Sequence, residues 1–188
     1  MTPSSGSPPP ESITVALPQS YPPLAFLDPA GQLRGLTVDR WALWQAKTGI
    51  KVNLLLQDWG SAKADFLAGK IDVVDGMPPA KDQDPAIHYA EPYLKMNLVL
   101  TFHEGISGIV DAETTRGFVI GVRRDGACEG LLRAAGSVNM KTYPDFPSLF
   151  LAGQHGDVRV VCAPDLTSTY YLNLMGVAKE FRQSAPLV

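Results

Sequence analysis

The chain has 188 residues, of which 45% are hydrophobic and 19% charged, and its formal net charge is −3. This composition is typical of a globular protein with a substantial core, and its mild acidity and scattered basic residues argue against nucleic-acid binding. No apolar run reaches the roughly 18 residues that a membrane span requires.

The N-terminal stretch MTPSSGSPPPES is rich in proline, serine and glycine. It has neither the charged region nor the apolar region of a signal peptide, and it carries too few apolar side chains to fold. We interpret residues 1–11 as a disordered leader or a remnant of cloning. Any secretion signal or membrane anchor would then have been removed or would never have existed, and contact with a membrane would depend on such segments.

After the leader, the first half of the chain alternates between strand-like and helix-like segments. Strands are indicated by short β-branched and aliphatic runs, and helices by apolar periodicity with a glycine at the end. The predicted elements are a strand at 13–18, a turn between two extended arms at 24–35, a helix at 38–48, a strand at 51–57, a helix at 61–68 and a strand at 71–75. The order β-α-β-α-β predicts a mainly parallel sheet.

The first predicted helix carries recognisable end signals. Thr37 precedes it at the position of an N-cap, Asp39 complements the helix dipole in the first turn, and Gly49 follows the last residue. Val38 and Trp41 lie on one face at helical spacing. We therefore expect this face to pack on the sheet.

The second half repeats the alternation. Its predicted elements are strands at 117–122, 139–143 and 158–163 and helices at 126–135, 146–153 and 166–175. The joining stretch EPYLKMNLVLTF has no linker composition and is interpreted as an extended strand. We therefore predict an α/β fold of two lobes, lobe one at 12–95 and lobe two at 102–183, that share a crossover strand at 96–101.

Five segments, in this order, resemble family 3 of the bacterial extracellular solute-binding proteins. They are YPPLAFLDPAGQLRGLTVDRWALW, QDWGSAKADFLAGKIDVVDGM, YAEPYL, RGFVIGVRRDGACEGLLRAAG and GDVRVVCAPDLTSTYYL. The resemblance extends over residues 13–188. It implies a two-lobed periplasmic-binding-protein-like fold of type II, a Venus flytrap whose cleft closes on a small solute. It also implies that the crossover strand at 96–101 is a hinge, that residues 184–188 are the start of a return crossover, and that the C-terminal elements of lobe one are missing.

Parallel sheets place ligands beyond the carboxyl ends of their strands. In lobe one this position, together with the resemblance, marks Tyr21, Trp59, Asp75, Gly76 and Met77 as candidate ligand-binding residues. An aromatic side chain can stack on a planar group, a carboxylate can meet a cation, and a glycine lets the backbone approach a ligand. The alternatives are a core tryptophan, a tyrosine packed at the hinge and an aspartate that caps the next turn.

In lobe two, the candidate ligand-binding residues are Arg123, Arg124 and Asp165. The two arginines directly follow a predicted strand and precede a helix, where an anion is favoured. At least one of them is expected to face solvent.

The chain departs from the family at the positions that grip an amino acid. In the amino-acid-binding members a threonine and an arginine hold the α-carboxylate, and these positions fall on Pro78 and Gln83 here. Proline has no N–H to donate, and glutamine cannot form a charged bidentate contact. The family's amine-binding aspartate falls on Pro164. We therefore expect a ligand other than an ordinary L-amino acid, an altered grip, or a cleft that has lost binding.

The two cysteines, Cys128 and Cys162, have neither the number nor the spacing of a zinc site, and we predict no metal and no cofactor. Two interpretations stay open: unrelated buried thiols, or a disulfide, which favours an oxidising compartment. Both cysteines are expected at the cleft end of lobe two.

Two classes of function compete. The GLTVDRW helix, the GISGIVDAE segment and the DGAC turn most resemble the periplasmic sensor domains of membrane histidine kinases and diguanylate cyclases. We therefore favour a domain that closes on a small molecule and signals to such a module. The alternatives are a free ABC transporter component and an enzyme on the same fold, such as a cyclohexadienyl dehydratase. Because lobe one is expected to lack covering elements, we also predict a homodimer through its exposed flank.

Overall fold

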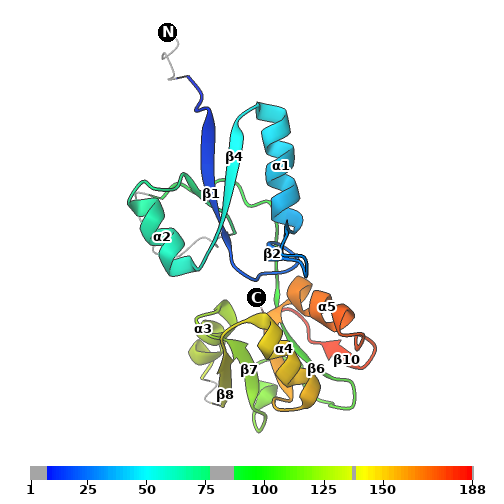
Figure 1. The fold of residues 1–188 in the computed structure, drawn as a ribbon. Coiled ribbons are helices and arrows are strands. Elements are labelled where there is room, and N and C mark those ends of the chain that lie inside the picture. The colour runs from blue at the N-terminus through cyan, green and yellow to red at the C-terminus, as the bar shows by residue number, and fades with distance from the viewer. Residues whose placement is uncertain (1–7, 77–86, 137–138, 188) are drawn as a thin grey trace. The chain divides into compact units, whose positions relative to one another are not determined.

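The computed structural model describes residues 8–76, 87–136 and 139–187. Most of the predicted leader, residues 1–7, lies outside this range. The chain divides into two compact units, residues 1–91 (unit 1) and 92–188 (unit 2). Each unit is an α/β layer structure built on its own sheet (Figure 1).

Unit 1 contains a parallel sheet in which β1 is the central strand. Its strands are β1 (Ser12–Pro18), β4 (Lys51–Gln57) and β5 (Val73–Val74), in the order β4-β1-β5. The short strands β2 (Phe26–Leu27) and β3 (Leu33–Arg34) form a separate antiparallel pair. The predicted β-α-β-α-β order is therefore observed, although the third strand is shorter than expected.

Two helices cover the unit 1 sheet, one on each face (Figure 1). Helix α1 (Leu36–Thr48) places Val38 and Trp41 against Val15 and Leu17 of β1. Helix α2 (Trp59–Leu67) packs on the opposite face. Neighbouring residues of β1 point to opposite faces of a sheet, which is why this strand contributes to both cores.

The start of α1 corrects the sequence prediction. Gly35, not Thr37, is the N-cap residue, and Thr37 is buried in the first turn. Gly35 has φ = 131°, and a Cβ there would collide with the carbonyl oxygen of Leu24. Because only glycine fits this close approach, a contact with a distant turn, not a capping side chain, determines where the helix begins. Its predicted end is confirmed: Gly49 is a left-handed C-cap.

Unit 2 contains a mixed sheet in the order β10-β6-β9-β7-β8. The strands are β6 (Leu98–His103), β7 (Ile120–Arg123), β8 (Met140–Tyr143), β9 (Val160–Pro164) and β10 (Phe181–Gln183). Strands β7, β8 and β9 are parallel, β6 is antiparallel to β9, and β10 is antiparallel to β6. The sequence did not predict β10, which is only three residues long.

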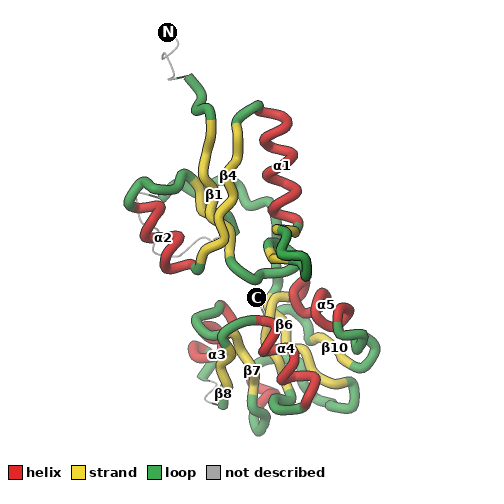
Figure 2. Tube along the Cα trace, in the orientation of Figure 1, coloured by secondary structure: helices red, strands yellow, loops and turns green. Residues whose placement is uncertain are grey.

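A helix follows each of the strands β7, β8 and β9 of unit 2. They are α3 (Ala127–Ala134), α4 (Phe146–His155) and α5 (Asp165–Leu174), and a 3₁₀ turn spans Glu113–Thr115. Only the later part of the predicted crossover strand is paired in a sheet. Residues 87–97 form neither helix nor strand, and regular pairing begins at Leu98 (Figure 2).

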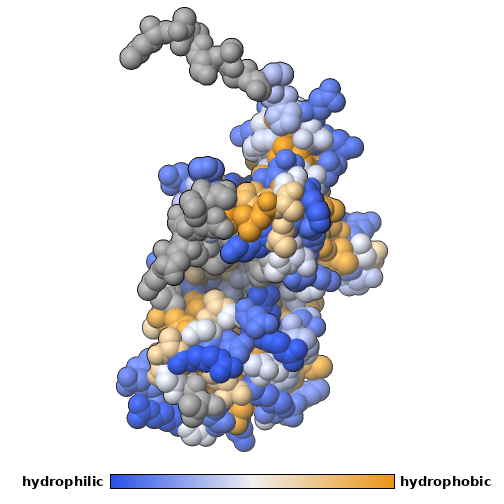
Figure 3. Space-filling view, turned by 90° about the vertical axis from the view of Figure 1, so that its left-hand side faces the viewer, coloured by the Kyte–Doolittle hydropathy of each residue, from blue (hydrophilic) through white to orange (hydrophobic). Residues whose placement is uncertain are grey.

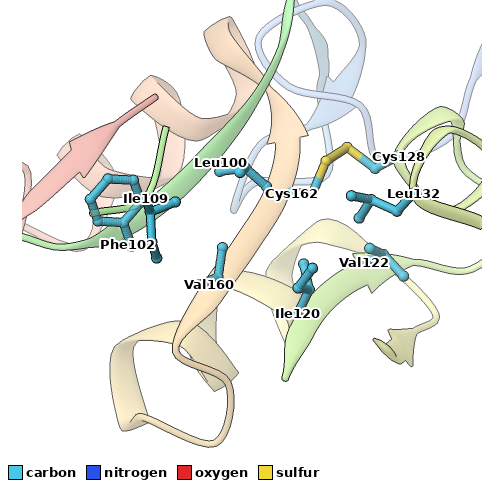
Figure 4. Packing of buried hydrophobic residues seen from close by; sticks show 9 residues of the cluster. All are labelled: Leu100, Phe102, Ile109, Ile120, Val122, Cys128, Leu132, Val160 and Cys162. Carbon is cyan, nitrogen blue, oxygen red and sulfur yellow. A yellow bond between two sulfur atoms is a disulfide. The ribbon is translucent and has the colours of Figure 1, made fainter. Parts of the chain in front are cut away.

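The core of unit 2 fills both sides of its sheet. Nine buried residues gather on the side of α3: Leu100, Phe102, Ile109, Ile120, Val122, Cys128, Leu132, Val160 and Cys162 (Figure 4). On the other side, Gly121 lets α4 approach the sheet closely. A Cβ there would lie 2.7 Å from Cδ1 of Leu149 and 2.9 Å from Cγ2 of Val158.

The face shown in Figure 3 carries hydrophilic residues with hydrophobic groups between them. Among the described residues of unit 1, five leucines are exposed, with exposed fractions between 41% and 56%: Leu27, Leu36, Leu43, Leu55 and Leu67. Among the described residues, no helix combines the length and apolarity needed to cross a membrane.

Candidate functional site

The carboxyl ends of the parallel strands in unit 1 form one edge of its sheet. Tyr21 follows β1, helix α2 begins at Trp59 directly after β4, and Asp75 and Gly76 follow β5. The structure thus brings these four positions to the same edge, as the topology requires. The side chain of Trp59 and all of Met77, Pro78 and Gln83 lie outside the described residues.

Tyr21 is held by its backbone at the start of a tight turn. Its N–H donates to the carbonyl of Ala25 at 2.8 Å, and its own carbonyl accepts from the N–H groups of Leu24 and Ala25 at 2.8 and 3.1 Å. The intervening Pro22–Pro23 peptide is cis. The tyrosine side chain is half-buried at this edge.

Asp75 is a buried carboxylate, 5% exposed. Its Oδ2 accepts a 2.6 Å hydrogen bond from Nε1 of Trp41 and lies 3.7 Å from Nη1 of Arg40. Both partners belong to α1, so the carboxylate connects the end of β5 to that helix. The sequence suggested two roles for Asp75, a partner for a cationic ligand or a cap for the following turn. Neither role included a contact with Trp41 or Arg40.

Gly76 follows with φ = 83°, a left-handed conformation that side chains disfavour. The sequence pattern indicates that this glycine is a position where the backbone can closely approach a ligand. Its backbone conformation gives a second, local reason for glycine at the exit from β5.

Unit 2 has a corresponding edge. Strands β7, β8 and β9 end there at Arg123, Tyr143 and Pro164, and β6 begins there because Leu98 pairs with Pro164 in the antiparallel register. The candidate residues Arg124 and Asp165 are next in the chain after two of these strand ends. All three lobe-two candidates therefore lie at one edge of the sheet.

The two arginines have different surroundings. The guanidinium of Arg123 lies over the ring of Phe146, 4.9 Å from its centroid, which is a cation–π arrangement. Arg124 is exposed, and its backbone N–H donates to the carbonyl of Tyr143 at 2.7 Å. Asp125 then adopts φ = 54°, and the N–H of Gly126 donates to the carbonyl of Arg123. This tight turn leads directly into α3.

A nearby acid reduces the positive charge of this turn. Glu129 accepts hydrogen bonds from Nη2 of Arg133 at 2.6 Å and from the backbone N–H of Asp125 at 2.8 Å. These contacts, with that from Arg133 the strongest, lower the pKa of Glu129 below its usual value, and Arg124 adds to the effect. The carboxylate therefore stays ionised beside the arginines at neutral pH.

Asp165 does not present an unoccupied carboxylate. Its Oδ2 accepts from Nδ2 of Asn97 at 2.9 Å, and its Oδ1 accepts from the N–H of Leu166 at 2.7 Å. The backbone N–H of Asp165 donates to the carbonyl of Asn97 at 2.9 Å. The sequence had not marked Asn97, because the residue before a strand carries no local signal of a partner 68 positions away.

Cys128 and Cys162 form a disulfide that joins the first turn of α3 to β9 (Figure 4). Both cysteines are buried, at 5% and 1% exposure. Cys162 pairs with Val122, the residue directly before Arg123. Across the described ranges, no cluster of three or more histidine, cysteine, aspartate or glutamate side chains could hold a metal ion.

Two open depressions occur elsewhere on unit 2. One, of about 300 Å³, lies between α5 and β10 and includes Leu172 and Phe181 in its lining. The other, of about 330 Å³, lies beside the 3₁₀ turn and the end of α3. Neither is lined by a residue that the sequence marked as ligand-binding.

Solved structures share this fold. An ancestral arginine-binding protein bound to arginine aligns with a TM-score of 0.80 and 22% identity, over 93% of this chain and 78% of that chain. A substrate-binding protein of an ABC uptake transporter from Streptococcus pneumoniae, with bound histidine, gives 0.81 and 21%, over 95% and 76%. A histidine kinase sensor domain with similarity to periplasmic binding proteins gives 0.81 and 17%, over 95% and 78%.

These identities establish the fold alone, a two-lobed periplasmic-binding-protein-like architecture. A search among curated proteins found no match. The family of bacterial extracellular solute-binding proteins, family 3, matches residues 13–184, which is nearly the whole chain. The order of elements, the two sheets with their strand-end edges and this match lead to one conclusion: the chain belongs to family 3 of the bacterial extracellular solute-binding proteins.

Proposed function

We propose that this chain is the extracytoplasmic solute-binding domain of a membrane-attached sensor, which closes on a small molecule and signals to a kinase or cyclase module. Membership of a solute-binding family supports the binding role and is the observation that carries it. The candidate residues at the two strand-end edges, Tyr21, Trp59, Gly76, Arg123 and Arg124, are proposed to contact the ligand.

The disulfide supports an extracytoplasmic location. Disulfides persist in oxidising compartments such as the periplasm and are rare in the cytosol. Cys128 and Cys162 are both buried in the core of unit 2, where the bond contributes to packing as well as to covalent connection.

Segments of the sequence that resemble sensor domains support the sensor role. The DGAC turn, in which Asp125 is left-handed and Cys128 is bonded to β9, is one of the segments that resembles sensor domains. The alternative is a free transporter component, and the similarity to the pneumococcal transporter protein favours it to a comparable degree. No catalytic activity is proposed for the domain itself.

Native mass spectrometry of freshly purified protein tests the binding role. We expect a small molecule of a few hundred daltons to be retained, or a library of small polar solutes to raise the melting temperature. Protein that retains nothing from several extracts and shows no shift with any solute would contradict solute binding. Turnover of a cyclohexadienyl substrate would instead establish the enzyme alternative.

A chimera tests the sensor role separately. Residues 12–188 would replace the sensor domain of a structurally similar membrane histidine kinase, and phosphorylation would be followed with and without the solute found above. Solute-dependent phosphorylation is expected. A domain that binds its solute but leaves phosphorylation unchanged in correctly inserted chimeras would favour the transporter role.

A further inference from the structure

Asn97 and Asp165 are joined by two hydrogen bonds that run in opposite directions. The backbone N–H of Asp165 donates to the carbonyl of Asn97, and the side-chain amide of Asn97 donates to the carboxylate of Asp165, each at 2.9 Å. The second carboxylate oxygen accepts from the N–H of Leu166 at 2.7 Å. The pair is partly buried and connects segments 68 residues apart. Both oxygens of Asp165 are thus engaged within the protein.

The position of this pair in the chain is informative. From Leu98 onward the crossover is bonded on both sides. Leu98 pairs with Pro164 of β9, and its carbonyl accepts from the N–H of Leu187 at 2.7 Å. Ser184 bonds Leu100 twice, through its N–H at 2.8 Å and its Oγ at 3.0 Å. Ser184 and Leu187, near the end of the described chain, are therefore hydrogen-bonded to β6 of the unit 2 sheet.

The chain before Asn97 differs. Residues 92–95 are exposed, and residues 87–97 contain neither helix nor strand. The division between the two units falls at residues 91 and 92. Asn97 is consequently the last residue before the regular pairing of β6, and its side chain, as well as its backbone, is bonded to α5.

We propose that Asp165 is a positioning residue and not a ligand contact: together with Asn97 it forms a clamp that fixes the start of the crossover to unit 2. This inference deepens the proposed function, since it locates the joint that a closing domain needs in residues 92–96. Hinges are short segments that absorb changes of φ and ψ between elements held rigid by packing. The clamp supplies the rigid side of that joint.

Hydrogen exchange of backbone amides, measured by NMR without any ligand, tests the clamp. The informative amides are those of Asp165 and Leu187, which donate to Asn97 and Leu98. With Asn97→Ala or Asp165→Ala, exchange at these two amides should accelerate about tenfold or more, as expected for loss of a hydrogen bond to a charged group. Exchange at Val122 and Val161, in the centre of the sheet, should change little.

A matched control and a rescue separate the clamp from a general loss of stability. Asn173→Ala removes an asparagine side chain that lies in α5 and donates to the carbonyl of Thr169. This control should leave the Asp165 and Leu187 amides protected. Asn97→Asp should remove protection, because two carboxylates then face each other. The combination Asn97→Asp with Asp165→Asn reverses donor and acceptor and should restore protection.

Two results would overturn the proposal. One is unchanged exchange at the Asp165 and Leu187 amides in Asn97→Asp. The other is failure of the combined substitution to restore protection while each protein remains folded by circular dichroism. Because no ligand enters the experiment, a negative result would not bear on solute binding, and a failure to find a solute would not bear on the clamp.

Discussion

Asp75 shows how one buried carboxylate organises unit 1. Its hydrogen bond from Trp41 satisfies an indole N–H, and Arg40 lies near enough to balance part of its charge. We predict that Asp75→Ala lowers the free energy of unfolding of unit 1 by about 1–3 kcal/mol, because the indole N–H loses its acceptor in a partly buried site.

Urea denaturation followed by tryptophan fluorescence measures this change, since the chain has three tryptophans and all of them, Trp41, Trp44 and Trp59, belong to unit 1. Asp39→Ala is the control. It removes an exposed carboxylate from the first turn of the same helix and should cost no more than about 1 kcal/mol. Equal losses in the two variants would contradict a structural role for Asp75.

Two glycines of unit 2 should respond to alanine in opposite ways. At Gly121 a methyl group would meet Leu149 and Val158 at less than 3 Å, so Gly121→Ala should destabilise the unit by about 1–3 kcal/mol through overpacking. At Gly130, inside α3, nothing lies within 4 Å of the added methyl group. Gly130→Ala should therefore stabilise by up to about 1 kcal/mol. Thermal unfolding followed by circular dichroism distinguishes these signs, and a stabilising Gly121→Ala would show that α4 can move away.

At the scale of elements, the disulfide is the strongest single connection between a helix and the sheet of unit 2. It links residues 34 positions apart, and closing a loop of that size in the unfolded chain is worth about 3–4 kcal/mol in the entropic account. The double variant Cys128→Ala/Cys162→Ala should lose about that much stability, measured by guanidinium denaturation.

A thiol titration in denaturant provides the independent check on this bond. The chain contains two cysteines, so unreduced protein should show no free thiol and reduced protein should show two. Two free thiols before reduction, in protein secreted into an oxidising compartment, would contradict the pairing.

The elements also show which boundaries local signals determine. The predicted limits of β4, residues 51–57, are those observed, because an aliphatic run between polar turns specifies a strand by itself. The predicted start of α1 was wrong because the observed start depends on a contact with Leu24. That residue lies eleven positions before Gly35, and the local helix signals do not include it. Strand β10 was missed because three residues are too few for a periodic pattern and pairing with β6 defines it.

At the scale of the whole molecule, the first prediction concerns ligand class. The family resemblance of the sequence predicts that Pro78 and Gln83 occupy the positions that grip an α-carboxylate in the amino-acid-binding members, and both lie outside the described residues. Loss of such a charge-assisted contact typically costs about 2–5 kcal/mol, which weakens binding by roughly 30-fold to several thousand-fold. Calorimetry should therefore detect no tight binding of the twenty ordinary L-amino acids.

A matched double variant reintroduces the threonine and arginine that hold the α-carboxylate in the amino-acid-binding members. Pro78→Thr combined with Gln83→Arg should bind at least one L-amino acid more tightly than the unmodified chain does. Micromolar binding of an amino acid by the unmodified chain would mean that other residues, with Arg123 and Arg124 the first to examine, hold the carboxylate.

Self-association is the second prediction at this scale. The five leucines exposed on unit 1 form apolar surface of the kind that other chains cover. Light scattering should show a dimer of the 20.3 kDa chain at micromolar concentration. Leu55→Lys should shift the protein toward monomer, whereas Leu174→Lys, at an exposed leucine of unit 2, should not. A monomer at every concentration would contradict the dimer.

The sequence by itself determined the family, the α/β class, the alternation of elements in both halves and the strand ends at which the candidate residues lie. These features depend on hydrophobic periodicity, glycine stops and ordered motifs, all of which are local in the chain. Only the tertiary structure decided which side chains contact one another. Trp41 and Arg40 for Asp75, Asn97 for Asp165 and Cys162 for Cys128 lie 34 to 68 residues away. Such contacts follow from which strand edges the fold brings together, and no spacing within a segment specifies them.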